Sequence, residues 1–297
     1  MRNRRPVFVV GFARGGTNLV LNLLRSHPDL ASPRGETHEV FRGKASEPAA
    51  VRRAKRLRYR PIVWLEGRDV FDASDWSPRP PLRAASRFWI DRLLFAEKLR
   101  AREPGQNLWK TEGVAYTQRE LRRARLLCKN VNGLIRVSGE FSRIFPDAHF
   151  IGLVRDGYAV CEGHRRRGIP LLEAARHYEI GCRQLAEDAL GIPRFRLFRY
   201  EDLVTSPRQA LADLCEAAGV DPGLVSRVRL ETKPVVGAGG APEAETGAKR
   251  LGWYGLDEFA SRFRRDANAN QRARLSAAET AEIREACAWS LERFGYR

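Results

Sequence analysis

The stretch Val7-Phe8-Val9-Val10-Gly11-Phe12-Ala13-Arg14-Gly15-Gly16-Thr17-Asn18 decides the fold of this chain of 297 residues. Residues 7–10 are apolar, mostly β-branched and followed by Gly11, which is typical of a buried strand. Residues 17–26 then carry valine and leucine at helical spacing until His27-Pro28 stops the pattern. The chain therefore opens with a strand, a glycine-rich loop and a helix.

This strand–loop–helix unit predicts a site for a phosphate or sulfate group. The backbone N–H groups of the loop converge on one point, where the N-terminus of the helix adds partial positive charge. Gly15 and Gly16 let the backbone bend and let an anion approach closely. Arg14 supplies a planar cation with several donors, and Thr17 supplies a hydroxyl. We therefore predict that Arg14, Gly15, Gly16, Thr17 and Asn18 bind a cofactor.

The loop differs from that of nucleoside triphosphatases, which reads G-x-x-x-x-G-K-[ST]. Gly11 and Gly16 have the required spacing, but Thr17-Asn18 stands where Lys-[ST] is expected. The lysine that reaches the terminal phosphates is missing, and so is the hydroxyl that binds magnesium. A kinase or triphosphatase is therefore disfavoured.

Strands and helices alternate along the rest of the chain. Further strands are predicted at residues 149–154 and 194–198, and helices at residues 85–99, 118–127, 134–145, 158–167, 171–190, 207–218 and 276–294. This alternation predicts an α/β fold with a P-loop-like parallel β-sheet flanked by helices on both faces. We expect a single domain over residues 1–297. A surface excursion is expected at about 42–105, its first part (42–61) basic and without a clear pattern, and a mobile loop at about 232–250.

Net charge and the numbers of cysteines and histidines limit the possible functions but do not select one. With 53 Lys and Arg against 36 Asp and Glu, the net charge is +17. Such a charge attracts a nucleotide, an acidic acceptor, nucleic acid or a membrane surface, although abundant arginine alone would also explain it. The five cysteines form no C-x-x-C pair and the five histidines are scattered, so neither a disulfide framework nor a metal site is predicted.

The location of the protein follows from its hydrophobic segments. There is no run of about 18 apolar residues, and the apolar segment near the N-terminus is too short for a signal peptide. These features predict a cytoplasmic protein.

Four segments share their order and spacing with a known family. They are Gly11–Leu19 followed by His27-Pro28, the stretch 145–157 with Val154-Arg155-Asp156, Tyr200-Glu201-Asp202-Leu203, and Lys249-Arg250-Leu251-Gly252-Trp253. They resemble the superfamily of sulfotransferases that use PAPS, 3′-phosphoadenosine 5′-phosphosulfate, and release adenosine 3′,5′-bisphosphate. Gly35-Glu36-Thr37 and residues 128–157 look closest to tyrosylprotein sulfotransferases and related bacterial enzymes, within a group that also includes carbohydrate sulfotransferases.

The resemblance implies roles for residues at both ends of the nucleotide. The glycine loop would hold the 5′-phosphosulfate, with Gly15 and Asn18 in place of the family's usual hydroxyl residues. Arg155 would bind the 3′-phosphate. The serine that the family places eight residues later falls on Gly163, so either its contact is lost or a neighbour such as His164 or Arg167 supplies it.

The late basic segment would close over the nucleotide. This role falls on Lys249 and Arg250, which we add to the predicted cofactor-binding residues.

Sulfuryl transfer needs an acceptor oxygen in line, a base for its proton, donors for the leaving phosphate and a dry site. The similar enzymes place a catalytic glutamate at Glu36, which we predict to be the general base, with Glu39 and His38 as rivals. Arg14 would stabilise charge on the bridging oxygen.

A lysine often assists catalysis in this family. Lys129 lies within one position of the expected place, and Lys110 is the alternative. Four aromatic residues could line an acceptor pocket, stack on adenine or belong to the core: Phe88, Trp89, Trp109 and Tyr116.

The sequence thus predicts a sulfotransferase that moves a sulfuryl group from PAPS to a hydroxyl-bearing acceptor, with small molecules, carbohydrates or lipids favoured. The acceptor could be anionic, a lipid acceptor would bring peripheral membrane contact, and no nucleic acid is expected. Two alternatives remain, a kinase-like phosphotransferase and a non-enzymatic protein that binds polyanions or nucleic acid. The second alternative is motivated by the net charge of +17; Arg52-Arg53-Ala54-Lys55-Arg56 and Arg165-Arg166-Arg167 fit it loosely, but no recognised nucleic-acid-binding module does.

Overall fold

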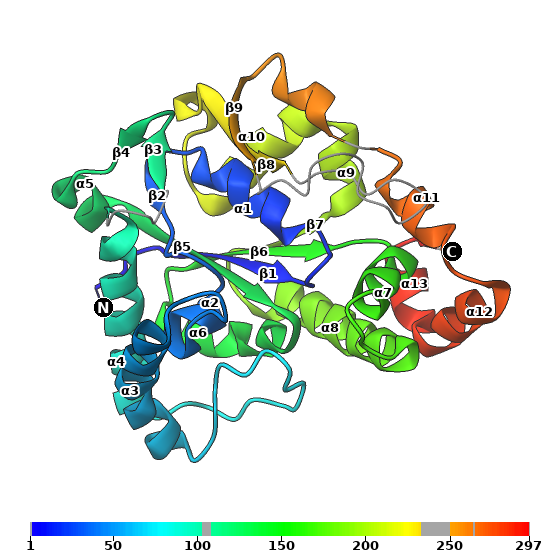
Figure 1. The fold of residues 1–297 in the computed structure, drawn as a ribbon, viewed down its shortest axis with the longest axis horizontal. Coiled ribbons are helices and arrows are strands. Elements are labelled where there is room, and N and C mark those ends of the chain that lie inside the picture. Colours follow the sequence, from blue (N-terminus) through cyan, green and yellow to red (C-terminus); the bar gives the residue numbers. More distant parts are fainter. Residues whose placement is uncertain (1, 103–107, 233–249, 264, 297) are drawn as a thin grey trace.

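The computed structural model describes residues 2–102, 108–232, 250–263 and 265–296. Its central sheet is built from β1 Val7–Gly11, β2 Leu30–Ala31, β5 Arg125–Val131, β6 His149–Val154 and β7 Phe195–Arg199. These strands are all parallel and lie in the order β2-β5-β1-β6-β7 (Figure 1). Their carboxyl ends therefore meet at one edge, which is where open α/β sheets bind ligands.

Helices cover both faces of this sheet, as predicted. Helices α1 Thr17–Arg25 and α10 Pro207–Ala218 lie on one face, whereas α6 Ser138–Ile144 and α8 Leu171–Gly191 lie on the other (Figure 1). Strand β1 serves both layers because successive side chains of a strand point to opposite faces. The predicted class, a P-loop-like α/β fold with a parallel sheet, is confirmed.

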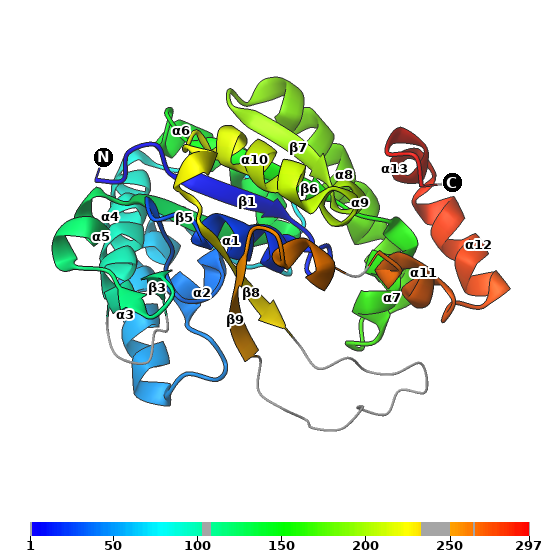
Figure 2. The same ribbon diagram turned by 90° about the horizontal axis from the view of Figure 1, so that it is seen from above.

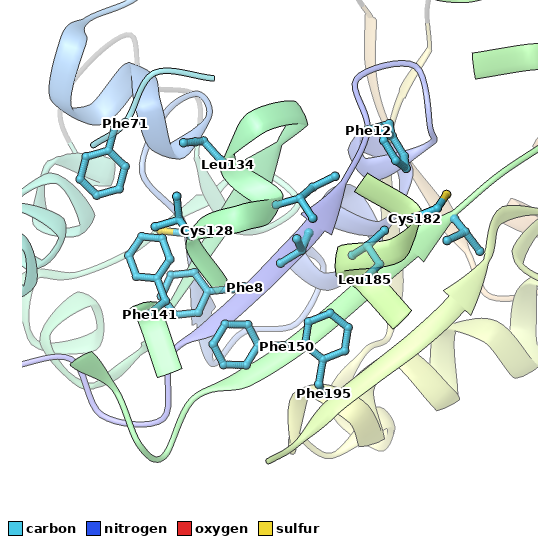
Figure 3. Close-up of a cluster of buried hydrophobic side chains, with 14 of the residues drawn as sticks. Phe8, Phe12, Phe71, Cys128, Leu134, Phe141, Phe150, Cys182, Leu185 and Phe195 are labelled. Atoms are coloured by element: carbon cyan, nitrogen blue, oxygen red, sulfur yellow. The ribbon is translucent and has the colours of Figure 1, made fainter. Parts of the chain in front are cut away.

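The larger hydrophobic layer is rich in aromatic rings. Phe8 of β1 stacks on Phe141 of α6 with ring centroids 4.5 Å apart, and on Phe150 of β6 at 5.3 Å (Figure 3). Phe150 stacks in turn on Phe195 of β7 at 5.9 Å. The stacked rings join β1, β6, β7 and α6 in one hydrophobic layer.

The remaining helices surround this framework. They are α2 Thr37–Arg42, α3 Ala49–Glu66, α4 Ala84–Leu99, α5 Gln118–Arg123, α7 Gly157–Arg165, α9 Tyr200–Thr205, α11 Ala267–Arg272, α12 Ala277–Ala286 and α13 Ala288–Arg293, with 3₁₀ helices at Arg100–Arg102, Asn132–Val137, Pro222–Leu224 and Phe259–Arg262. Two antiparallel strand pairs complete the described fold: β3 Trp109–Thr111 with β4 Val114–Ala115, and β8 Arg227–Thr232 with β9 Arg250–Gly255. In Figure 2, β8 and β9 lie beside α1, and α11 lies beside α7.

The strand β5 corrects the prediction of a helix over residues 118–127. Helix α5 ends at Arg123, because Ala124 adopts an extended conformation with φ −55° and ψ 141°. The next seven residues form β5, whose central Leu126, Leu127 and Cys128 are buried between the two helical layers. This strand has only one β-branched residue, Val131, and arginines precede it, so its composition resembles that of a helix.

The expected surface excursion at 42–105 is also corrected in part. It contains α3 and α4, and their residues Tyr59, Ile62, Ile90 and Leu94 belong to the main hydrophobic core. The sequence of α3 shows no clear helical pattern, because only Lys55, Tyr59 and Ile62 of this helix are buried. None of the helices in the described ranges combines the length and the hydrophobicity that crossing a bilayer requires.

Two further predictions concern the C-terminal part. The helix predicted from 276 is α12 followed by α13, with a break at Cys287, and the Ser276 side chain caps it by accepting from the N–H of Glu279. The mobile loop predicted at 232–250 falls almost entirely outside the described residues, which resume at the start of β9.

Candidate active site

The glycine loop lies at the carboxyl end of β1 in a conformation suited to anions. Arg14 has φ 69° and Gly16 has φ 93°, so two residues adopt the left-handed conformation. A Cβ atom at Gly16 would lie 2.4 Å from Cδ2 of Tyr200, so only glycine fits there. Within the described residues, no group accepts from the N–H groups of Gly16, Thr17 and Asn18. These donors at a helix N-terminus are free to bind an anion.

Neighbouring elements fix the loop from both sides. The N–H of Ala13 donates to Oδ1 of Asn132, which follows β5, at 2.9 Å. The carbonyl of Ala13 accepts from Nε2 of His164 on α7, also at 2.9 Å. The Thr17 hydroxyl is buried and donates to the carbonyl of Phe12 at 3.4 Å. The loop is therefore held in place by the protein itself.

The Arg14 side chain has a surplus of positive charge around it. Burial lowers the pKa of its guanidinium, and Arg167, Arg166 and Arg155 lower it further. No side chain or carbonyl of the described residues forms a hydrogen bond or ion pair with this guanidinium. These nearby cations repel one another, and a bound anion would reduce that repulsion.

Glu36, Lys129 and Asn18 meet beside the loop. Nζ of Lys129, on β5, lies 2.8 Å from Oε1 of Glu36 and also donates to Oδ1 of Asn18. The lysine is 5% exposed and the glutamate 26%, so the carboxylate opens to solvent while its partner is enclosed. Burial lowers the pKa of Lys129, and the charge of Glu36 opposes that effect.

The rival candidates occupy other positions. Oε2 of Glu39 accepts from the N–H of Glu36 at 2.8 Å, so this carboxylate caps α2. Nδ1 of His38 lies 3.6 Å from Oε2 of Glu36. Nζ of Lys110 pairs with Glu120 at 2.6 Å. The structure thus brings Lys129, and not Lys110, to Glu36.

Arg155, which the resemblance assigns to the 3′-phosphate, also forms several hydrogen bonds within the protein. It is 7% exposed at the end of β6, and it donates to the carbonyl of Arg14 at 2.7 Å and to Oδ1 of Asn268 at 2.8 Å. It also donates to Gln271, and its guanidinium lies 4.3 Å from the ring centroid of Tyr200. Burial is the main cause of its lowered pKa. Three of its five N–H donors have partners among the described residues, and the other two could serve a ligand.

Gly163 lies against the loop from the side of α7. A Cβ atom there would lie 3.0 Å from both Cβ and Cγ of Arg14, which is tighter than ordinary contact. Two neighbours were proposed to replace the family's serine. His164 already binds the carbonyl of Ala13 in the loop. Arg167 is exposed, and among the nearby charges it lowers the pKa of Arg14 most.

The other predicted residues are dispersed. Lys249 lies outside the described residues, and only the backbone of Arg250 is described, at the start of β9. Tyr116 belongs to a small buried cluster and donates its hydroxyl to the carbonyl of Leu30 at 2.7 Å. The aromatic residues that remain lie at the surface of α4 or in β3: Phe88, Trp89 and Trp109.

Three residues around the loop were not singled out from the sequence. Asn132 follows a strand that ends at the ligand-binding edge, and that position was the available signal. Asn268 and Gln271 lie on α11, more than a hundred residues after Arg155, and no motif marks them.

Comparisons with known proteins give the family and the fold of the chain. Residues 6–222 match the sequence profile of the sulfotransferase family. The sulfotransferase domain from the olefin synthase of Synechococcus PCC 7002 has 21% identity and a TM-score of 0.52, over 100% of this chain and 97% of that chain. The sulfotransferase domain from the curacin biosynthetic pathway has 16% identity and the same TM-score, over 100% and 99%. No curated protein sequence matches the chain significantly.

The two solved domains show the shared fold, and the sequence profile covers most of the chain. The glycine loop, β5, β6 and the Tyr200 segment all lie within the matched residues. This chain belongs to the sulfotransferase family.

Proposed function

We propose that this protein transfers a sulfuryl group from PAPS to the hydroxyl of an acceptor, with Glu36 as the general base. The observation that carries the proposal is the contact of Lys129 with both Glu36 and the loop residue Asn18. It links a carboxylate that is open to solvent with a loop suited to anions. When bound, PAPS would supply the sulfuryl group on its 5′-phosphate.

The residues around the loop fit such a nucleotide. The free N–H groups of Gly16, Thr17 and Asn18 would donate hydrogen bonds to the 5′-phosphosulfate, and Arg14 would pair with its charge. The two remaining donors of Arg155 would serve the 3′-phosphate. A site with several cations and few compensating acids has the charge that a nucleotide with anionic groups at both ends needs.

The reaction needs one proton transfer. Glu36 would take the proton of the acceptor hydroxyl as the oxygen bonds to sulfur and the bond from sulfur to the bridging oxygen breaks. Arg14 and Lys129 would stabilise the charge that stays on the bridging oxygen. Lys129 also holds the carboxylate of Glu36 in a fixed place, which favours in-line attack.

The acceptor belongs to a broad class in this proposal. A hydroxyl of a small molecule, a carbohydrate or a lipid would suit a base that is partly exposed. The net charge of +17 favours an anionic acceptor, because the basic surface would draw it to the site.

The test measures transfer of labelled sulfate from PAPS to a panel of acceptors, with Glu36→Gln beside wild type. We expect transfer by wild type and a loss of about 10²–10⁴-fold in the variant, the range of general acid–base catalysis. The variant should still bind adenosine 3′,5′-bisphosphate in calorimetry with EDTA present. Undiminished transfer by Glu36→Gln would refute the base.

The same measurements separate the alternative functions. A protein that binds neither PAPS nor its product would refute the whole proposal. Magnesium-dependent turnover of ATP would indicate a phosphotransferase, and salt-sensitive DNA binding without nucleotide binding would indicate a polyanion-binding protein.

A further inference from the structure

Helix α3 exposes an unusual combination of side chains. Arg53, Arg56, Leu57, Arg60 and Trp64 recur at spacings of three and four residues, which places them along one side of the helix. We call this set the α3 face. It points away from the protein, since Lys55, Tyr59 and Ile62 on the opposite side are the buried residues of the helix.

The α3 face is both apolar and cationic. The side chains of Trp64 and Leu57 are 80% and 57% exposed. Arg53 and Arg60 have no hydrogen-bond or ion-pair partner among the described residues. The helix has one acid, Glu66 at its end, which accepts from the N–H of Arg83. Nothing on the face itself therefore compensates its charge.

A cavity of about 590 Å³ adjoins the α3 face. Four of its lining residues are arginines of α3: Arg52, Arg53, Arg56 and Arg60. Leu57 and Val63 add apolar surface. The wall also contains Asp69, but its carboxylate pairs with Arg42 at 3.2 Å. The cavity thus offers surplus positive charge next to apolar surface, which suits a phosphate group on an amphiphilic molecule.

We propose that the α3 face docks on a bilayer that contains anionic phospholipids, with a lipid phosphate headgroup in the cavity. Arginine pairs with lipid phosphates while tryptophan and leucine enter the boundary between headgroups and acyl chains. Nucleic acid would match the charge, but it would leave the exposed Trp64 and Leu57 without an apolar environment.

The docking surface is connected to the candidate active site by α2. This helix begins directly after Glu36 and ends at Arg42 on the cavity wall, about 9 Å along its axis for six residues. The proposal does not depend on sulfuryl transfer, because it concerns only binding to a surface.

The test uses the full-length protein and extruded vesicles of phosphatidylcholine and phosphatidylglycerol in equal amounts, with pure phosphatidylcholine vesicles for comparison. Co-sedimentation should show binding to the mixed vesicles and little to the neutral ones. The triple variant Arg53→Ala, Arg56→Ala, Arg60→Ala should bind about a hundredfold more weakly, since each arginine near an anionic surface contributes about fivefold. Trp64→Ala should weaken binding several-fold at unchanged charge.

A matched control removes the same charge elsewhere. Arg122, Arg176 and Arg284 are exposed on α5, α8 and α12, and their triple alanine variant should bind like wild type. An equal loss in both triple variants would show unspecific attraction and overturn the proposal. So would an unaffected Trp64→Ala variant, or binding of DNA or inorganic phosphate by the α3 face without binding to vesicles. Circular dichroism confirms that each variant is folded.

Discussion

Nζ of Lys129 lies 2.8 Å from Oε1 of Glu36 and at the same time donates to the side chain of Asn18. One buried cation thereby connects the end of the glycine loop, the strand β5 and the start of α2. Desolvation lowers the pKa of Lys129, and the carboxylate beside it opposes that effect without cancelling it. The two side chains act as a unit, and changing one should change the environment of the other.

Replacement of Lys129 by methionine tests this unit. Lys129→Met keeps the length of the side chain but frees Glu36 from its partner, so we expect kcat/KM for sulfuryl transfer to fall by about a hundredfold. Binding of adenosine 3′,5′-bisphosphate should change less. Lys110→Met is the control, because Lys110 pairs with Glu120 away from the loop, and it should retain activity. Full activity of Lys129→Met would refute its role.

Arg14 and Arg155 should respond differently to the same substitution. Arg14→Met should weaken binding of adenosine 3′,5′-bisphosphate by about tenfold or more, with little change in the melting temperature, because the Arg14 guanidinium forms no hydrogen bond or ion pair with the described residues. Arg155→Met should lose both affinity and stability, because it donates to the carbonyl of Arg14, to Asn268 and to Gln271. Calorimetric titration and thermal denaturation measure the two quantities. Equal losses of stability would contradict this division.

Restoring the family's serine at Gly163 should weaken nucleotide binding. A Cβ atom at this position would lie 3.0 Å from Cβ and Cγ of Arg14, so serine would push the arginine out of place. We expect Gly163→Ser and Gly163→Ala to bind adenosine 3′,5′-bisphosphate several-fold more weakly. Gly139→Ala on α6 is the matched control, since nothing lies within 4 Å of its added Cβ. Tighter binding by Gly163→Ser would show that the hydroxyl contact outweighs the crowding.

Local sequence patterns were sufficient to predict the strands and helices whose own residues are mostly buried and apolar. The strand at Val7–Gly11, the strand at His149–Val154 and the helix at Pro207–Ala218 have the bounds, or nearly the bounds, that their sequences predict. In each, apolar residues are set off by glycine, proline or charged residues. The parallel sheet then follows from the order of elements.

Tertiary context decided the remainder. Strand β5 forms because β1 and β2 pair with it on either side, and its own composition does not reveal this. The position of Lys129 came from the family resemblance, and its contact with Glu36 could not be predicted from a separation of 93 residues. The partners of Arg155 come from α11, whose place beside α7 depends on long-range packing.

Asp188 on α8 gives a stability prediction that is independent of the active site. Asp188 is 6% exposed, Oδ1 accepts from Nε2 of Gln184 at 2.9 Å, and Oδ2 has no hydrogen-bond partner in the part of the chain that the structure describes. Burial raises its pKa to about 7. Between pH ~4, where the carboxyl of the unfolded chain ionises, and pH ~7, the folded protein retains a proton that the unfolded chain has released. The free energy of unfolding should therefore fall as the pH rises through this window.

Asp188→Asn removes the ionisable group and keeps an acceptor for Gln184. At pH 8 the variant should be more stable than wild type by about 1–2 kcal/mol, because the wild-type protein then contains a buried carboxylate. At pH 4 the two should differ little. Asp213→Asn on α10 is the control, since Asp213 accepts from Gln209 across the same four-residue spacing but is itself more exposed than Asp188. Urea unfolding of both variants at the two pH values measures the effect, and a gain for Asp188→Asn at pH 4 equal to that at pH 8 would show that ionisation is not its cause.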